Sequence, residues 1–394
     1  MPKTVILGTA RTPIGKLGGA LSSVPAVELG GTAMAAALER ADVAPEQVDH
    51  VVMGQVVQAG VGMIPSRQAQ IRAGVPKEIS SETINKVCAS SVRSAVILDQ
   101  AIRAGDVEVG LGGGMESMSL APSLLPGARQ GFRLGDVKAL DAMQHDGLTN
   151  SFTGKAMFVE ATEVGAELGL PREELDRYAL RSQQRVAAAA DAGILAQEIV
   201  PVTIKGRKGD TVIDTDEAPR RETTLESLQA LPPLVGPEGS HTAGNSPGIN
   251  DGAASFVLAS DAWAAAHGKE ALGEIVGHAQ SANDFAYLAT TPGSAALKAL
   301  EKAGLTPQDV DLWEINEAFA SVAVNSIKML GIDEDCVNVN GGAIALGHPI
   351  AASGARIIGT LVHELRRRGG GLGCVAICSG GGQGDAILIR VPAS

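Results

Sequence analysis

Residues 84–91 read Ile84-Asn85-Lys86-Val87-Cys88-Ala89-Ser90-Ser91, and two different sequence patterns meet there. A short β-branched run stops at Cys88, and helical spacing of apolar residues begins at the same cysteine and runs to Gly105. At the first turn of a helix, free backbone N–H groups and the positive end of the helix dipole favour a thiolate. A lone cysteine at such a joint is more often a small packing residue. Cys88 is therefore a candidate nucleophile that needs chemical partners elsewhere in the chain.

The composition limits the class of protein. With 394 residues the chain is too long for one ordinary core, so we expect two or three packed units. Its formal net charge of −12 argues against nucleic acid or an anionic membrane surface as a partner. The basic pair Arg220-Arg221 still allows an anionic small-molecule substrate.

Cysteine usage and hydropathy indicate a reducing compartment. Four cysteines in so long a chain do not form a disulfide framework, and no C-x-x-C pair suggests structural zinc. A strand pattern starts at Thr4 with no leader before it, and no apolar run has membrane-spanning length. We therefore expect a cytoplasmic protein without membrane contact.

Strand patterns alternate with helix patterns along the first third of the chain. Strands are predicted at 3–9, 50–54 and 107–111, and helices at 26–40 and 67–73, the second with Ser66 as its N-cap. A glycine turn is predicted at 112–117. This alternation predicts an α/β fold with buried, mostly parallel strands.

The same plan returns near the C-terminus. Residues 37–49 match 299–311, and the helix, strand and glycine run that follow Cys88 recur at 351–382. Two matches in the same order indicate a duplicated α/β unit, with a site expected between the halves.

These boundaries divide the chain into three parts. We predict an N-terminal half at 1–118 plus 251–271, and a C-terminal half at 272–394. Between them, residues 119–250 contain Pro122, Pro126 and a polar helix at 173–192, which we interpret as an inserted loop domain that binds substrate.

Three polar groups of the C-terminal half stand at the ends of predicted elements. His348 lies in a turn framed by glycine and proline, Cys378 ends a buried strand before a glycine run, and Asn316 lies at a strand-to-helix joint. Each also has an ordinary structural explanation, as a satisfied histidine, a packed strand residue or a helix cap. The glycine runs do not match nucleotide-binding loops.

Taken together, five motifs resemble those of the thiolase family. They are NKVCAS at 85–90, GGMESM at 113–118, NEAF at 316–319, GHP at 347–349 and CSGGG at 378–382. They occur in the family's order and span nearly the whole chain. The first is more similar to the biosynthetic acetyl-CoA acetyltransferases than to the degradative 3-ketoacyl-CoA thiolases. The resemblance implies two duplicated α/β halves in five layers (αβαβα) with an inserted loop domain.

The resemblance also implies catalytic roles. Cys88 would carry the acyl group, His348 would accept its proton, and Cys378 would act as the acid or base on the α-carbon of a second acetyl-CoA. His348 with a water bound by Asn316 would stabilise the enolate, and the backbone N–H groups of Cys88 and Gly380 the tetrahedral intermediate. The reaction is a reversible Claisen condensation of two acetyl-CoA to acetoacetyl-CoA and CoA. It requires no metal and no tightly bound cofactor, because CoA and acyl-CoA are substrates.

The family's CoA-binding positions are matched in part. The matching residues are Leu148, Met157, Arg220, Ser227, Ala243, Gly244, Ala318 and Phe319. Three positions depart from the acetyl-specific pattern: Ala156 replaces histidine, Leu288 replaces methionine, and Pro247 replaces serine, with Ser246 adjacent. We therefore expect Ala156 to open space beside the acyl pocket for longer or branched 3-ketoacyl-CoAs.

Several alternatives remain at this point. Within the same fold, the chain could be a degradative thiolase of broader chain length. From a different class, it could be a non-catalytic thiolase-like lipid carrier or scaffold. A ketoacyl synthase would have histidine in place of Cys378, and a cysteine hydrolase would leave Cys378 without a task. The resemblance further implies fatty acid metabolism and a homo-oligomer, either a dimer or a tetramer.

Overall fold

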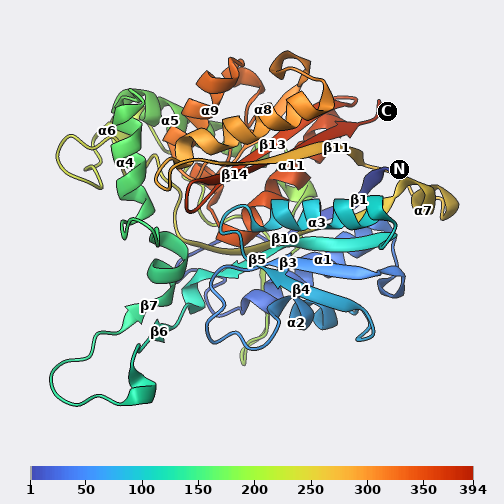
Figure 1. Cartoon of the computed structure of the whole chain (residues 1–394), viewed down its shortest axis with the longest axis horizontal. Coiled ribbons are helices and arrows are strands. Elements are labelled where there is room, and N and C mark those ends of the chain that lie inside the picture. The colour runs from blue at the N-terminus through green and yellow to red at the C-terminus, as the bar shows by residue number, and fades with distance from the viewer. Residues whose placement is uncertain (1, 394) are drawn as a thin grey trace.

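The computed structural model describes residues 2–393 and has alternating layers of helices and sheet (Figure 1). One half of the sheet contains β4 (Ser80–Ile84), β3 (His50–Gly54), β5 (Val109–Ser117), β10 (Asn250–Ser260) and β1 (Thr4–Arg11), with β2 (Gly15–Lys16) on β10. The other half contains β12 (Leu312–Ile315), β13 (Gly371–Ser379), β14 (Gln383–Val391) and β11 (Gly273–Ala282). A short antiparallel contact between β1 and β11 joins the two halves.

Helices fill the space between the half-sheets and cover their outer faces (Figure 1). The central helices are α3 (Ser90–Ala104) and α11 (Ser353–Arg367). The outer helices are α1 (Ala26–Ala41) and α2 (Pro65–Arg72) on one side, and α8 (Thr291–Ala303) and α9 (Ala320–Leu330) on the other. The five-layer α/β prediction is confirmed.

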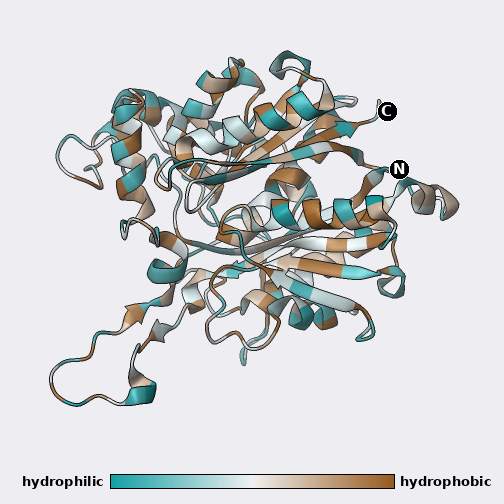
Figure 2. Ribbon diagram, viewed as in Figure 1, coloured by the Kyte–Doolittle hydropathy of each residue, from teal (hydrophilic) through white to brown (hydrophobic). Residues whose placement is uncertain are grey.

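Successive side chains along a strand point to opposite faces of the sheet, and each face packs into a different hydrophobic core. In β3, Val52 packs into the central core with α3 and α11, whereas Val51 and Met53 pack against α1. In β14, Ile387 faces the central core and Leu388 faces the core of α8 and α9. Because successive strand residues point to opposite faces, strands covered on both sides are apolar throughout. In Figure 2, brown hydrophobic segments recur along the strands, and the helices alternate between hydrophobic and hydrophilic residues.

The prediction of mostly parallel strands is wrong. Among the strands of the main sheet within residues 2–393, β3–β4, β3–β5 and β12–β13 pair in parallel, and the other pairs are antiparallel. A tight turn at 380–382 joins β13 to β14, and such a short connection permits only antiparallel pairing.

Two local predictions also fail. The glycines at 112–114 lie inside β5 and not in a turn, and at Gly112 a Cβ atom would lie 2.5 Å from the Phe256 ring. Helix α2 starts with Pro65 at its first position and Ile64 as its N-cap, so Ser66 is not the cap.

The repeated sequence stretches adopt the same structure. Each contains the end of an outer helix (α1 or α8) and a 3-10 turn (Pro45–Gln47 or Pro307–Asp309), and each leads directly into a strand (β3 or β12). The central helices approach closely, since a Cβ at Gly354 of α11 would lie 2.6 Å from the Val92 side chain of α3. The start of α11 is therefore fixed against the start of α3.

Residues 119–250 leave the layered body and return to it at β10. Their first part is a hairpin of β6 (Ser123–Leu124) and β7 (Leu140–Asp141) that projects from the body (Figure 1). A π-helix (Met143–Leu148), α4 (Met157–Glu167), α5 (Arg172–Asp191), the pair β8 (Val202–Ile204) and β9 (Thr211–Ile213), and α6 (Leu225–Gln229) follow. The remaining short helices are α7 (Asp261–Ala266) and α10 (Ala343–Leu346). No helix within residues 2–393 combines the length and apolar character that crossing a membrane requires.

Candidate active site

Cys88 stands in a strained elbow between β4 and α3. Val87 has a φ of 44°, in the left-handed region that β-branched residues rarely adopt. Three hydrogen bonds hold it: the Ser90 hydroxyl donates to the Val87 carbonyl at 2.7 Å, the Lys86 N–H donates to the Ser90 hydroxyl at 2.9 Å, and the Val87 N–H donates to the Asn85 side chain at 2.9 Å. The sequence predicted Cys88 in the first turn of the helix. That prediction is wrong, because α3 begins at Ser90 and Cys88 precedes it.

The environment of Cys88 favours a thiol and not the predicted thiolate. Burial, with the nearby Glu116 carboxylate as a smaller cause, raises the pKa of Cys88 to about 12. His348 Nε2 lies 3.3 Å from Cys88 Sγ, and burial together with the charge of Arg356 lowers the pKa of His348 to about 3. The resting pair is therefore a neutral thiol and a neutral imidazole, already in contact for proton transfer.

His348 is held in a turn between α10 and α11. The backbone N–H of His348 donates to Asn250 Oδ1 at 2.9 Å, and the ring atom Nδ1 lies 2.5 Å from the Ser353 hydroxyl. Gly347 has a φ of 107°, and a Cβ there would lie 2.5 Å from the Asn250 side chain. The glycine before the histidine is therefore required by the close approach of β10.

Cys378 is the second sulfur of the site. It lies near the end of β13 with 1% of its surface exposed, and burial, reinforced by Cys88, raises its pKa well above the usual value. The next residue, Ser379, donates its hydroxyl to the Lys86 carbonyl at 2.5 Å. The end of β13 is thus fastened to the loop that carries Cys88.

Gly380 follows in the turn, packed beside Val87. A Cβ added to Gly380 would lie 3.3 Å from the Val87 side chain. Gly380 and Cys88 both line the same cavity, so their backbones border one space.

Asn316 is buried between β12 and α9. Its N–H donates to the Ala376 carbonyl at 2.9 Å, but within residues 2–393 neither atom of its side-chain amide has a hydrogen-bond partner. A buried amide without a partner costs free energy, so this one favours contact with water or substrate.

Glu317, beside Asn316, has a role that the sequence did not reveal. Its carboxylate accepts hydrogen bonds from the Tyr178 hydroxyl at 2.9 Å and the Ser182 hydroxyl at 2.8 Å, both on α5. It also accepts from Asn338 at 3.0 Å and the Ile344 N–H at 2.9 Å. The acid of the NEAF motif therefore fastens the inserted domain to the C-terminal half.

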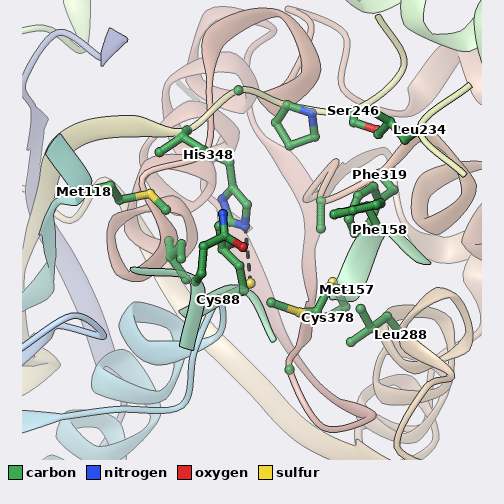
Figure 3. A pocket seen from close by; sticks show the side chains of 18 residues that line it. Cys88, Met118, Met157, Phe158, Leu234, Ser246, Leu288, Phe319, His348 and Cys378 are labelled. Carbon is green, nitrogen blue, oxygen red and sulfur yellow. Dashed lines mark hydrogen bonds between the residues drawn. The ribbon is translucent and has the colours of Figure 1, made fainter. Parts of the chain in front are cut away.

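Cys88, His348, Cys378 and Gly380 line a cavity of about 250 Å³ (Figure 3). A dashed line in Figure 3 joins the imidazole of His348 to Cys88. The lining of the cavity is otherwise mostly apolar: Met118, Leu148, Met157, Phe158, Leu234, Pro247, Ile249, Leu288, Ala318, Phe319 and Ile350, with Gln144, Ser246 and Gly248. The site combines two sulfurs and one imidazole with a mostly apolar cavity.

Part of the predicted CoA-binding set lines this cavity. Leu148, Met157, Ser246, Ala318 and Phe319 do so, as do two of the departing positions, Pro247 and Leu288. The Ser246 hydroxyl is buried and has no partner within the described residues. Ala156 is the N-cap residue of α4 and is not among the lining residues, so the expected space for longer acyl groups stays a prediction.

The remaining predicted residues lie outside the cavity lining. Asn316 is buried and does not line the cavity. Arg220 is exposed, and its backbone N–H donates to the Gln183 side chain at 2.9 Å. Ser227 takes part in the capping box of α6. Ala243 is exposed and Gly244 is buried, and a Cβ at Gly244 would lie 2.6 Å from the Leu228 side chain. Close packing against α6 is therefore enough to require a glycine at position 244, whether or not CoA passes beside it.

Two further residues support the site and were missed from the sequence. Ser353 contacts His348, and its position in the first turn of α11 was the available signal. His241 is buried, accepts or donates a hydrogen bond at 2.8 Å with Ser321, and stands edge-on to the Phe319 ring with centroids 5.6 Å apart. Burial lowers the pKa of His241 to about 4, so it supports the Phe319 wall as a neutral ring.

The described residues 2–393 contain no group of three or more histidine, cysteine or acidic side chains placed to hold a metal ion. The two sulfurs and the imidazole are accordingly the reactive groups that this arrangement offers.

Comparisons with known proteins agree with this geometry. Residues 4–262 match the model of the thiolase N-terminal domain, and residues 269–391 that of the thiolase C-terminal domain. An acetyl-CoA acetyltransferase of Cupriavidus necator is 47% identical over 391 residues, covering 99% of this chain and 100% of that protein. One of Escherichia coli K12 is 45% identical, with 99% of both chains covered.

Solved structures give the same result. The acetyl-CoA acetyltransferase of Syntrophomonas wolfei superposes with a TM-score of 0.96 at 40% identity, covering 99% of this chain and all of that one. The enzyme of Bacillus anthracis gives a TM-score of 0.97 at 38% identity, with 99% of both chains covered.

Proposed function

The chain belongs to the thiolase family, and on that premise we propose that it is an acetyl-CoA C-acetyltransferase, which interconverts two acetyl-CoA with acetoacetyl-CoA and CoA. One observation carries the proposal: Cys88 and Cys378 line one cavity, and His348 Nε2 lies 3.3 Å from Cys88 Sγ. Two sulfurs with one base suit a reaction that needs a nucleophile and, separately, an acid that protonates a carbon atom of the substrate.

The thiolysis direction starts from the neutral groups of the resting site. His348 takes the proton of Cys88, and the sulfur attacks the 3-keto carbon of acetoacetyl-CoA. The C–C bond breaks, leaving an acetyl thioester on Cys88 and the enolate of acetyl-CoA. The Cys378 thiol then protonates the enolate carbon. The raised pKa of Cys378 keeps that proton available until this step.

Free CoA completes the cycle. Its thiol proton passes to the Cys378 thiolate, and its sulfur attacks the acetyl group on Cys88. The Cys88 thiolate leaves and recovers its proton from His348. Every group returns to its resting state, and condensation is the same sequence in reverse.

Charge in these steps develops on oxygen at two places. We propose that the N–H groups of Cys88 and Gly380 hold the oxyanion at the acyl carbon, and that His348 with a water on Asn316 holds the enolate oxygen. The unpartnered amide of Asn316 supports its part in this. Removing one such donor typically costs about 3 kcal/mol of transition-state stabilisation.

CoA would act as a substrate and not as a tightly bound cofactor. The apolar cavity walls suit a pantetheine arm, and the free Ser246 hydroxyl suits one of its amide groups. We further propose that Arg220 meets the phosphates of CoA, with Ser227, Ala243 and Gly244 beside the nucleotide. The exposure of Arg220 leaves its charge available for this contact.

We also propose that the chain is a cytoplasmic homo-oligomer, a tetramer, of fatty acid metabolism, with domain boundaries at 118/119, 250/251 and 271/272. Large apolar side chains exposed on and beside the β6–β7 hairpin support assembly: Leu125, Phe132, Leu134 and Val137. Light scattering of the Phe132→Asp, Leu134→Asp variant tests it, and a wild-type monomer would contradict it.

An absorbance assay of acetoacetyl-CoA tests the activity. Cleavage that depends on CoA in the wild type, and that is lost in Cys88→Ala, is the expected result. A folded wild type without cleavage would contradict the proposal and favour a non-catalytic scaffold. A kcat/KM higher for 3-ketohexanoyl-CoA than for acetoacetyl-CoA would favour the degradative alternative.

A further inference from the structure

The GGMESM motif at 113–118 has no task in the chemistry above, apart from Met118 in the cavity wall. Its acid, Glu116, lies in β5 and is completely buried. One carboxylate oxygen accepts the Val57 N–H at 3.0 Å, and the other accepts the N–H groups of Val56 and Ala351, each at 3.2 Å. Backbone donors from two distant segments therefore converge on one side chain.

One of these donors belongs to the turn that carries His348. Residues 347–352, which we name the His348 turn, connect α10 to α11, and Ala351 lies three residues after the histidine. The other two donors, Val56 and Val57, follow β3. Glu116 thus fastens the His348 turn to the half-sheet that also carries the Cys88 elbow. Burial raises the pKa of Glu116 to about 7 against the effect of its three backbone donors.

A second residue of the motif contacts the same turn independently. A Cβ atom at Gly114 would lie 1.9 Å from the Ala351 carbonyl oxygen and 3.0 Å from the Ala352 nitrogen, both backbone atoms. Gly114 and Glu116 are two residues apart in a strand, so they face the same side. Ala351 is therefore held at its N–H by Glu116 and abutted at its carbonyl by Gly114.

We propose that Gly114 and Glu116 are positioning residues that seat the His348 turn, setting the contact between the imidazole and the Cys88 thiol. This rests on the proposed function for its catalytic consequence. Neither residue is a catalytic residue, because neither lines the cavity. Proton transfer over 3.3 Å tolerates little displacement of the imidazole from the Cys88 sulfur. Gly114 and Glu116 fix how far the His348 turn lies from the Cys88 elbow. Ser353 and Asn250 fix the orientation of the ring.

A Glu116→Gln variant tests the seat. Glutamine keeps the shape and one acceptor oxygen but places an NH₂ group toward a backbone donor. We expect kcat for thiolysis to fall about 10- to 100-fold while KM for acetoacetyl-CoA changes less than about 2-fold, because substrate contacts are intact. Glu116→Ala should lower kcat further, so kcat should decrease in the order wild type, Glu116→Gln, Glu116→Ala.

Glu364→Gln is the matched control. Glu364 is another buried carboxylate held by several donors, Asn340, Arg367 and Arg368, near the far end of α11. Its variant should lose stability and keep kcat. Equal losses of kcat in the two variants, or a folded Glu116→Gln enzyme with wild-type kcat, would overturn the proposal.

A pair of glycine variants separates the seat from general damage to β5. At Gly114 alanine meets the backbone of the His348 turn, whereas at Gly110 of the same strand it meets the flexible end of Leu98, 2.7 Å away. The readout is the rate of Cys88 alkylation by iodoacetamide, which needs His348 as base but no acyl-CoA, with thermal unfolding as the check on folding.

We expect Gly114→Ala to slow alkylation about 10-fold or more, and Gly110→Ala to leave the rate within about 2-fold of wild type. Unchanged alkylation in Gly114→Ala would overturn the seat. The alkylation assay does not involve thiolysis. A failure of the proposed acetyltransferase activity therefore leaves this test of Gly114 and Glu116 valid, and the two failures are distinguishable.

Discussion

The Nδ1 atom of His348 lies 2.5 Å from the hydroxyl oxygen of Ser353. That hydroxyl donates its single hydrogen to the Pro349 carbonyl at 3.0 Å, so it accepts from His348. Nδ1 therefore carries the ring proton, and the lone pair of Nε2 faces the Cys88 sulfur. One serine thus selects the tautomer in which the imidazole acts as a base.

Ser353→Ala should remove this selection. The buried Nδ1–H loses its acceptor, and the other tautomer, with a proton facing Cys88, becomes populated. We expect kcat for thiolysis to fall by about 10²-fold, within the range that general acid–base catalysis contributes. Ser326→Ala is the control, because this buried serine bonds only within α9, to Val322 at 2.7 Å. Comparable losses in both variants would rule out a tautomer effect.

The two buried cysteines of β13 should differ in function. Cys378→Ala should abolish enolate protonation and lower thiolysis by about 10²- to 10⁴-fold, while acetylation of Cys88 by acetyl-CoA persists at a lower rate, because CoA can leave as the thiolate without the Cys378 proton. Cys374→Ala, on the same strand but packed in the core of α8 and α9, should keep kcat and lose only stability. Steady-state assays and acetyl incorporation measure the two steps. Full thiolysis activity in Cys378→Ala would exclude the assigned role.

The reactivity of Cys88 should depend on pH in a specific way. Alkylation of the neutral thiol by iodoacetamide with His348 as base should not depend on pH near neutrality. Because burial raises the pKa of Cys88 to about 12, a second pathway through the thiolate should make the rate rise again toward pH 10. An ordinary cysteine levels off near its pKa of about 8.5. His348, with its pKa lowered to about 3, should add no inflection between pH 5 and 7. A rise in rate centred between pH 5 and 8 would indicate a thiolate formed near neutrality and contradict the neutral pair.

Stability below neutral pH should depend on His241. Its pKa falls from 6.5 to about 4 on folding because burial disfavours the charged ring. The unfolded chain therefore binds the proton first, so the contribution is complete above pH 6.5 and is lost as the pH falls toward 4. His241→Gln should show a flatter decline of unfolding free energy over this window in urea titrations. Parallel curves for variant and wild type would refute the assignment.

Local patterns predicted the α/β class and the duplication, the family resemblance implied the five layers and the roles of the two sulfurs, and tertiary contacts decided the rest. Periodicity located α1, α5 and β3 closely, because apolar faces dictate those elements. Strand direction was wrong, since it depends on how β10 and β14 enter the sheet from distant segments. The glycines of β5 suggested a turn, although close packing against Phe256 and Ala351 requires them in a strand.

The candidate site shows the same division. Motifs identified Cys88, His348 and Cys378, which line one cavity. The protonation state of Cys88 could not be predicted, because its pKa depends on burial that only the folded chain produces. Ser353, Glu116 and Glu317 were missed because each acts through a partner far away or on another element.

Trapping the acyl-enzyme tests the central claim most directly. The protein is incubated with acetyl-CoA, quenched in acid, digested and examined by mass spectrometry, and then incubated again with free CoA before quenching. We predict one acetyl group on the peptide that contains Cys88, its loss on addition of CoA, and none in Cys88→Ala. Acetylation at Cys378 alone, or no acetyl-enzyme in a folded wild type that cleaves acetoacetyl-CoA, would contradict the assignment of Cys88 as the acyl carrier.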